Sequence, residues 1–366
     1  MTQIEQNTLS TSDGISVTDN LRIADIQDVA DPKTVIEEYP VPPSVAQLVT
    51  RTRAEAHAIL HGQDDRVIAI VGPCSIHDPV AALDYGARLE ALRQNYSKDL
   101  LIVMRVYFEK PRTTVGWKGL INDPDLDGSF NINKGLRLAR KLLLDLNLAG
   151  VPAGTECLDL LTPQYVADLI SWSAIGARTT ESQLHRELAS GLSCPVGFKN
   201  GTDGNLKIAI DAVGAAAHPH HFLTVTKAGY LSIFETTGNE DGHVILRGGQ
   251  SPNYDRESIN TAAQMLESAG CSPRLMVDFS HANSGKQHRG QITVGADVSS
   301  QLAQGENRVV GVMIESHLVE GRQDVVAGSN LVYGQSITDA CLGWDDTIQV
   351  IDQLAAAVDT RRSLSR

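Results

Sequence analysis

Short apolar segments recur eight times along this chain, and longer stretches with helical spacing of apolar residues separate most of them. The short segments are apolar over nearly their whole length, and Gly and Pro residues punctuate them. This pattern is typical of parallel strands buried on both faces rather than of an antiparallel sandwich. The expected strands are 67–71, 100–106, 151–155, 172–177, 195–199, 221–226, 274–278 and 309–315.

Strand and helix repeated eight times predict an α/β protein with a single (β/α)8 TIM barrel, and 366 residues suit one barrel with additions. Residues 67–366 are expected to form this catalytic barrel. The polar residues 1–66 are expected to be an N-terminal extension that serves regulation and oligomerisation. Two β-branched runs flank Gly-Asn-Glu-Asp-Gly, which predicts a β-hairpin insertion at about 229–249, after the sixth strand.

Composition excludes several classes of partner. A formal net charge of −13 disfavours nucleic acid and anionic membrane surfaces, which need a broad basic face. No run approaches 18 apolar residues and the N-terminus lacks the apolar segment of a signal peptide, so we expect a cytoplasmic protein. The five cysteines are irregularly spaced without a C-x-x-C pair, which favours reduced thiols over disulfides.

Four residues with metal-ligand chemistry follow different strands at the barrel end where catalytic groups gather. They are Cys74, His281, Glu315 and Asp339. Each alone has an ordinary explanation in the core or on the surface, but four at one rim predict a metal site. Mixed sulfur, nitrogen and oxygen ligands suit Mn²⁺, Fe²⁺, Co²⁺ or Zn²⁺ rather than Mg²⁺ or Ca²⁺, and ligand type does not choose among the four.

Six basic residues lie at the same strand ends or on the loops that follow. They are Arg105, Lys110, Arg112, Arg178, Lys199 and Arg247. One basic residue at a rim is commonly a solvated surface group, but six on an acidic chain require counter-charges. Phosphate and carboxylate are the anions that Arg binds best, so a substrate with two anionic groups is implied.

Other polar residues near the strand ends carry weaker signals. Glu156 and His317 follow the third and eighth strands, and Lys227 follows the sixth. Lys227 or Lys199 could form a Schiff base, although an aldolase of that kind needs no metal. His185 lies within a helical stretch and is expected to be structural.

Several strings together carry a resemblance to a known family. They are Gly-Pro-Cys-Ser-Ile-His-Asp from Gly72, Arg-Val-Tyr-Phe-Glu-Lys-Pro-Arg-Thr-Thr from Arg105, Gly-Ala-Arg-Thr-Thr-Glu-Ser from Gly176, Gly-Phe-Lys-Asn-Gly-Thr from Gly197, Leu-Arg-Gly-Gly from Leu246, Asp-Phe-Ser-His-Ala-Asn from Asp278 and Ser-Ile-Thr-Asp-Ala-Cys from Ser336. From about Asp19 to the last helix, the chain resembles the class I, feedback-regulated 3-deoxy-D-arabino-heptulosonate-7-phosphate synthases of microbes.

The resemblance implies a transferase that condenses phosphoenolpyruvate with erythrose 4-phosphate and water and releases phosphate, as the first step of the shikimate pathway. It implies a divalent cation at the four residues named above. It also implies that Arg105, Arg178, Lys199 and Arg247 bind phosphoenolpyruvate, and that Lys110, Pro111, Arg112 and Thr113 bind erythrose 4-phosphate.

The candidate catalytic residues are Lys110, Glu156 and His281. In our mechanistic hypothesis, the enol carbon of phosphoenolpyruvate attacks the polarised aldehyde, and water captures the resulting cationic carbon. Lys110 would protonate the new alkoxide, and Glu156 would order the attacking water. Much of the catalysis would come from positioning two anions that repel each other.

A second site, for an aromatic amino acid effector, is implied by the same resemblance, together with a homodimer or homotetramer. The matching positions are Asp159, Leu160, Pro163, Gln164, Ser193 and Phe222, with Asp19 and Asn20 from a neighbouring subunit. Thr155-Glu156-Cys157 departs from the Gly-Glu-Phe expected there, which puts the identity of the effector in doubt. The string Gly-His-Val-Ile-Leu-Arg-Gly-Gly favours tyrosine.

Three other functions stay open at this point. The nearest is a related 3-deoxy-ulosonate phosphate synthase that takes another aldose phosphate, such as arabinose 5-phosphate; the string Lys110-Pro111-Arg112-Thr113 argues against it. The second is a Schiff-base aldolase. The third is a barrel kept only for binding or regulation, which the complete set of metal ligands disfavours.

Overall fold

The computed structural model of the chain describes residues 18–112, 114, 116–326 and 328–364. The chain divides into two compact units, Met1–Ala30 and Asp31–Arg366. The described part of the first unit, residues 18–30, has neither helix nor strand. Its apolar side chains Leu21, Ile23, Ile26 and Val29 are all more than half exposed.

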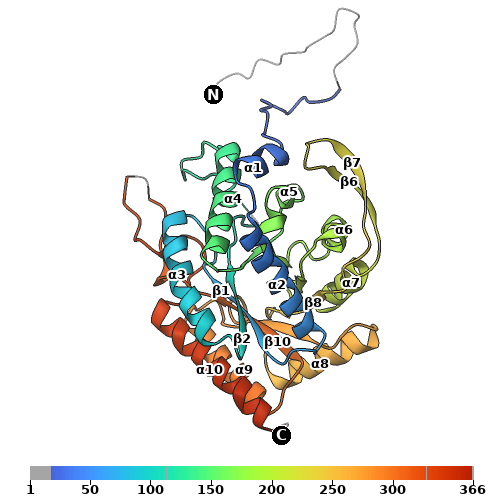
Figure 1. Ribbon diagram of the computed structural model, residues 1–366, viewed down its shortest axis with the longest axis vertical. Coiled ribbons are helices and arrows are strands. Elements are labelled where there is room, and N and C mark those ends of the chain that lie inside the picture. Colours follow the sequence, from blue (N-terminus) through green and yellow to red (C-terminus); the bar gives the residue numbers. More distant parts are fainter. Residues whose placement is uncertain (1–17, 113, 115, 327, 365–366) are drawn as a thin grey trace, which may run out of the picture. The chain divides into compact units, whose positions relative to one another are not determined.

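The second unit is built on a closed barrel of eight parallel strands, which confirms the predicted fold (Figure 1). In chain order the barrel strands are β1 (Val67–Gly72), β2 (Leu100–Arg105), β3 (Ala153–Glu156), β4 (Ile170–Ile175), β5 (Val196–Lys199), β8 (Gly242–Leu246), β9 (Leu275–Asp278) and β10 (Val309–Glu315). The barrel closes where β1 pairs with both β2 and β10. Nearly every residue of these strands is buried, as their continuous apolar runs predict.

A helix follows each barrel strand. These helices are α3 (Pro79–Asn95), α4 (Ile132–Leu148), α5 (Pro163–Val166) with the 3₁₀ helix η1 (Ala167–Leu169), α6 (Gln183–Gly191), α7 (Lys207–Ala216), α8 (Arg256–Ser268), α9 (Gly290–Ala303) and α10 (Trp344–Leu364). Side chains cap the amino-terminal ends of several of these helices. At α3, for example, the Asp78 carboxylate accepts hydrogen bonds from the main-chain amides of Val80 and Ala81. A short parallel pair, β11 (Val319–Arg322) and β12 (Gln335–Ser336), lies between β10 and α10.

Two further helices precede the barrel, α1 (Pro32–Glu38) and α2 (Pro43–Leu60). Both belong to the same compact unit as the barrel. Ala56, Ile59 and Leu60 of α2 are buried in one cluster with barrel residues such as Ile68 and Met276. The predicted functional boundary at residue 66 stays a prediction, but α2 is a structural part of the barrel.

The predicted place of the hairpin and the identity of the sixth strand are wrong. His221–Val225 is not a barrel strand: this segment, β6, pairs antiparallel with β7 (Leu231–Glu235) and forms the hairpin itself. The sixth barrel strand is β8, so the insertion precedes the sixth strand instead of following it. The physical reason lies in the burial pattern, because β6 and β7 are mostly exposed or half-buried, with only Thr224 buried, whereas β8 is almost entirely buried.

In the part of the chain that the structure describes, none of the helices is long and apolar enough to cross a membrane.

Candidate active site

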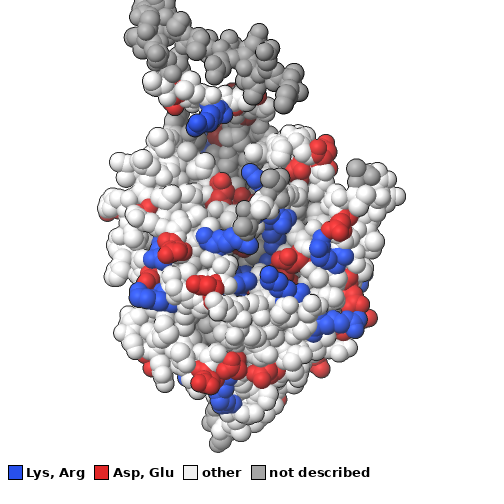
Figure 2. All heavy atoms as spheres, turned by 180° about the vertical axis from the view of Figure 1, so that it is seen from behind, with Lys and Arg blue, Asp and Glu red and all other residues white. Residues whose placement is uncertain are grey.

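A cleft of about 570 Å³ is lined by residues from the carboxyl ends of the barrel strands and the loops after them. The six basic residues predicted to share this rim all line it: Arg105, Lys110, Arg112, Arg178, Lys199 and Arg247. Figure 2 shows Lys and Arg side chains gathered in the middle of one face of the molecule, with Asp and Glu side chains among them. An acidic chain therefore concentrates positive charge where an anionic substrate could enter.

Three of the four predicted metal ligands come together at the wall of this cleft, where Glu315 and Asp339 line it and Cys74 is buried behind them. Ligand atoms of Cys74, Glu315 and Asp339 all lie within 4.8 Å of one another. The thiol of Cys74 lies 3.5 Å from Oδ2 of Asp339. Cys74 and Glu315 are buried, whereas Asp339 is exposed, so the group is open on one side.

The fourth predicted ligand, His281, lines the same cleft. Its Nδ1 lies 2.9 Å from Oδ2 of Asp278 and 2.7 Å from Oγ of Ser280. A carboxylate on one ring nitrogen fixes the orientation of the ring and leaves the other nitrogen for a ligand. The role of His281 as a metal ligand stays a prediction.

Lys110 approaches the same three-residue group. Its Nζ donates a hydrogen bond to Sγ of Cys74 at 3.0 Å. Burial opposes the charge on Lys110, but Cys74 and Glu315 outweigh this effect and raise its pKa. Burial, followed by the charge of Glu315, raises the pKa of the Cys74 thiol. A bound cation would have to offset that cost, because a metal takes the thiolate.

Arg105, the last residue of β2, is held rigidly beneath the cleft. It is 1% exposed and donates hydrogen bonds to Oε1 of Glu315 at 2.9 Å and to the Pro73 carbonyl at 3.1 Å. Its guanidinium also lies 3.5 Å from the centre of the Tyr107 ring. Among the described residues, no group accepts a hydrogen bond from its Nη1. A buried cation with a free donor is well suited to a carboxylate ligand.

The other phosphoenolpyruvate candidates extend this positive surface. Nζ of Lys199, at the end of β5, lies 3.0 Å from Oδ2 of Asp278, and both residues are buried. Arg247 follows β8 directly and is 8% exposed, whereas Arg178 is exposed. Burial lowers the pKa of Arg247 from its ordinary value. Because β8 is the sixth barrel strand, Arg247 lies directly at a strand end, and no insertion separates it from the barrel.

The predicted binding site for erythrose 4-phosphate lies on the loop after β2. Lys110, Pro111 and Arg112 all line the cleft, and Nε of Arg112 donates to the carbonyl of Trp117 at 2.8 Å. Thr113 lies outside the described residues.

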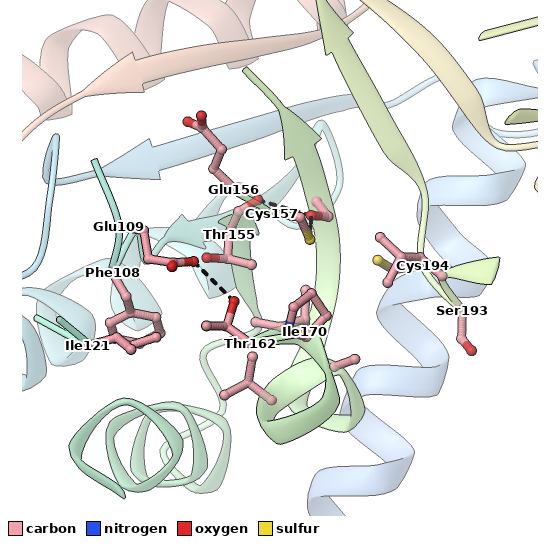
Figure 3. Close-up of a pocket in the computed structure, with 15 residues that line it drawn as sticks. Phe108, Glu109, Ile121, Thr155, Glu156, Cys157, Thr162, Ile170, Ser193 and Cys194 are labelled. Atoms are coloured by element: carbon pink, nitrogen blue, oxygen red, sulfur yellow. Dashed lines mark hydrogen bonds between the residues drawn. The ribbon is translucent and has the colours of Figure 1, made fainter. Parts of the chain in front are cut away.

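Glu156, at the end of β3, stands between the cleft and a small cavity of about 20 Å³. Figure 3 shows its carboxylate pointing away from Thr155, Cys157 and Thr162, which line the small cavity. The carboxylate lies against Gly176, where a Cβ would collide with Oε1. Glycine at this position therefore leaves room for Glu156 between two strand ends.

The effector candidates are brought only partly together. Asp159, Leu160 and Phe222 line a cavity of about 440 Å³ whose other walls are mainly leucines. Pro163 and Ser193 line the small cavity instead. The main-chain carbonyl of Gln164 accepts a hydrogen bond from Nζ of Lys227. Asp19 and Asn20 belong to the separate first unit, so their part in this site stays a prediction.

Two residues of the site were underestimated in the sequence. The ring of Tyr107 stacks on the guanidinium of Arg105. The sequence could have indicated this contact, because residues two apart in an extended chain have their side chains on the same face. Asp278 pairs with both Lys199 and His281.

The weaker candidates lie elsewhere. Lys227 lies in the turn of the β6–β7 hairpin, and His185 contacts Ser182 and the carbonyl of Leu158.

A barrel with a cation-lined cleft and a cluster of potential metal ligands at its catalytic end defines a class of enzyme that acts on anionic metabolites. Residues 43–352 match the model of the DAHP synthetase I family. The chain belongs to this family. The expected enzyme, a 3-deoxy-7-phosphoheptulonate synthase of the transferase class, is confirmed by this membership and by the relatives that follow.

Similar proteins cover nearly the whole chain. The Phe-sensitive phospho-2-dehydro-3-deoxyheptonate aldolase of Escherichia coli K12 is 59% identical over 94% of this chain and 98% of its own length. The phospho-2-dehydro-3-deoxyheptonate aldolase of Haemophilus influenzae is 58% identical over 94% of this chain and 95% of its own. A solved structure of such an aldolase from Francisella tularensis SCHU S4 is 52% identical, with a TM-score of 0.91, over 93% of this chain and 99% of that one.

Proposed function

We propose that this chain condenses phosphoenolpyruvate with erythrose 4-phosphate and water to 3-deoxy-D-arabino-heptulosonate 7-phosphate and phosphate, the first step of the shikimate pathway. The observation that carries this proposal is that six cationic residues line one cleft and that a cluster of three potential metal ligands adjoins it through Glu315 and Asp339. Membership of the DAHP synthetase I family supports the same reaction.

The phosphoenolpyruvate site is assigned to the deep side of the cleft. Arg105 offers its free Nη1 to the carboxylate from a position fixed by Glu315 and Tyr107. Lys199 reaches the same region, and Arg178 and Arg247 supply further charge for the phosphate. A buried, pre-oriented set of donors binds an anion without first having to be ordered.

Erythrose 4-phosphate is assigned to the mouth of the cleft, at Lys110, Pro111 and Arg112 on the loop after β2, with Thr113 as a predicted fourth residue. Arg112 is exposed, and its Nε is anchored to a carbonyl of its own loop. This loop would hold the sugar phosphate so that its aldehyde faces the enol carbon of the first substrate.

The residues present fit a divalent cation. The ligand atoms of a thiol, a buried carboxylate and an exposed carboxylate lie within 4.8 Å of one another, and His281 lines the adjoining cleft. When bound there, a cation such as Mn²⁺, Fe²⁺, Co²⁺ or Zn²⁺ would act as a Lewis acid toward the aldehyde oxygen. The sulfur and nitrogen donors favour these ions over Mg²⁺ and Ca²⁺, which prefer oxygen ligands alone.

Two residues of the chain are assigned to proton transfer and to orienting water. Lysine is protonated at neutral pH, and the amino group of Lys110 reaches the metal-ligand group at Cys74, so it can deliver a proton to the alkoxide formed when the carbon–carbon bond closes. Glu156 faces the cleft beside Gly176 and is placed to orient the water that adds to the cationic carbon. Loss of phosphate from the resulting hemiketal then completes the reaction.

The test is a phosphate-release assay with phosphoenolpyruvate and a panel of aldose phosphates, before and after treatment with a strong chelator. We expect activity with erythrose 4-phosphate that chelation abolishes and Mn²⁺ or Co²⁺ restores. Preference for arabinose 5-phosphate would favour the related 3-deoxy-ulosonate phosphate synthase. Full activity in protein shown to be free of metal would contradict the assigned role of the cation.

The cavity lined by Asp159, Leu160 and Phe222 is assigned to feedback inhibition by an aromatic amino acid. Its leucine-rich wall suits an aromatic ring, and Asp159 offers a carboxylate to an ammonium group. Similar proteins include both Phe-sensitive and Trp-sensitive enzymes. Initial rates with phenylalanine, tyrosine and tryptophan test this assignment, and inhibition by none of the three would contradict it.

A homo-oligomer is the assembly proposed for this chain, because the exposed apolar residues Leu21, Ile23, Ile26 and Val29 would leave a single chain with an apolar edge in water. Light scattering on the purified protein distinguishes a monomer from a dimer or tetramer.

A further inference from the structure

Two histidines and one aspartate form a compact group away from the catalytic cleft. His57 and His61 are four residues apart at the end of α2, and Asp241 immediately precedes β8. Nδ1 of His57 and Nε2 of His61 lie 2.7 and 2.9 Å from the same carboxylate oxygen, Oδ1 of Asp241. Figure 1 shows the end of α2 close to β8, in agreement with these contacts.

The spacing of the two histidines suits a shared ligand. Residues at i and i+4 lie on one face of a helix, and here the two rings are 4.2 Å apart between centroids. The ligand atoms of all three residues lie within 4.8 Å of one another. The side chains of His57 and His61 are about one-third exposed, so an ion can reach them from solvent.

Hydrogen bonds fix both the strand segment and the helix that carry this group. The amide of Asp241 donates to Oδ1 of Asn239 at 3.1 Å, and the amide of Val196 donates to the Asp241 carbonyl at 3.3 Å. On the helix side, Arg53 donates to the carbonyls of Ala167 and Ile170. Helix α2 and the segment before β8 are thus held in place before any ion binds, although His57 and Asp241 are 184 residues apart in sequence.

Hydrogen bonds alone can explain the present geometry, with each ring donating to the carboxylate. The same atoms need to move only slightly to hold a metal, because ligands about 2.0–2.2 Å from a tetrahedral ion lie roughly 3.3–3.5 Å from one another. An opening of about half an ångström is within the reach of partly exposed side chains. Two imidazoles and a carboxylate are a ligand set that Zn²⁺ accepts, with water in the fourth position.

We propose that His57, His61 and Asp241 bind a divalent cation of the zinc class, and that this ion ties helix α2 to the start of β8. The site lies at the amino-terminal end of a barrel strand, whereas Cys74, Glu315 and Asp339 lie at the carboxyl-terminal end. Its role is structural, since α2 supplies Ala56, Ile59 and Leu60 to the core of the barrel. It does not depend on the proposed reaction.

The experiment counts ions in the full-length protein. The protein is stripped with a chelator and dialysed against Zn²⁺, and bound zinc per chain is measured by elemental analysis. We expect two ions for the natural chain, one for His61→Gln, one for Cys74→Ala and none for the double variant. His218→Gln removes an exposed histidine outside the group and should leave two.

A second measurement separates a specific site from loose binding. In the Cys74→Ala background, Zn²⁺ should raise the melting temperature by about 2 °C or more, because an ion that binds only the folded state stabilises it. The rise should vanish when His61→Gln is added and persist with His218→Gln. Equal zinc content in the natural chain and His61→Gln, or no bound zinc in Cys74→Ala, would overturn the proposal.

Discussion

The hydroxyl of Thr162 donates a hydrogen bond to the carboxylate of Glu109 at 3.1 Å. Glu109 precedes Lys110, whose amino group contacts Cys74 in the catalytic cleft. Thr162 follows the segment Asp159–Leu161, which lines the leucine-walled cavity assigned to the effector. The pair therefore joins the loop that carries a catalytic candidate to the wall of the second cavity.

If this contact transmits inhibition, Thr162→Val should weaken feedback while leaving catalysis nearly unchanged. One hydrogen bond contributes about 1 kcal/mol, so we expect the concentration for half inhibition to rise about fivefold. Initial rates against effector concentration measure the change. Thr360→Val, which removes an exposed hydroxyl from α10, is the matched control. Unaltered inhibition in Thr162→Val would show that the contact takes no part.

Glu109 should also make stability depend on pH. Burial, followed by the charge of Asp159, raises the pKa of Glu109 to about 7, so the folded protein keeps a proton that the unfolded chain has lost. The stability from this group is fully present below about pH 4.5 and is lost as pH rises through 7. As pH rises from about 4.5 to above 7, the free energy of unfolding of Glu109→Gln should increase by up to about 3 kcal/mol relative to that of the natural chain.

Urea unfolding at pH 5 and pH 8 checks this prediction, because the difference between variant and natural chain cancels the other titrating groups. Glu240→Gln, which replaces an exposed carboxylate, should show no such pH dependence. A Glu109→Gln variant that changes stability equally at both pH values would contradict the assigned pKa.

Cys74→Ala should lose the catalytic cation and lower activity by more than about 100-fold, since even residues behind metal ligands typically contribute 10–100-fold. Cys271→Ala is the control, because that thiol is partly exposed outside the cleft. Metal content and phosphate release are measured together. Full activity of Cys74→Ala with undiminished metal would remove Cys74 from the ligand set.

Arg247→Ala and Arg112→Ala should separate the two anion sites. Loss of one charged hydrogen bond corresponds to about 10- to 100-fold in the Michaelis constant. We expect Arg247→Ala to raise this constant for phosphoenolpyruvate and Arg112→Ala to raise it for erythrose 4-phosphate. Steady-state kinetics with each substrate varied in turn gives both values, and equal effects on both substrates would refute the assignment.

Deletion of residues 1–30 should leave catalysis largely intact and remove most of the feedback inhibition, while loosening the oligomer. The reason is that the barrel unit begins at Asp31, whereas the apolar residues of the first unit are exposed. Rates against effector concentration and light scattering test both effects. A truncated enzyme that is still fully inhibited would show that residues 1–30 have no part in regulation.

Sequence patterns alone determined the barrel and most of its catalytic end. Continuous apolar runs mark strands buried on both faces, and residues at their carboxyl ends must share one rim, so the sequence alone predicts that Arg105, Lys199 and Glu315 lie together. Local patterns erred at His221–Val225, where a β-rich segment resembles a barrel strand but pairs with its neighbour as a hairpin.

Only the tertiary structure decided which groups touch. The contact of Lys110 with Cys74 and that of His57 and His61 with Asp241 join residues far apart in sequence. The spacing of apolar residues indicates which side of a segment is buried, because each side chain contacts either the core or solvent. It does not indicate which distant segment packs against that side. That choice is made by the packing of the whole barrel, which is why no local pattern could place Asp241 beside His57 and His61.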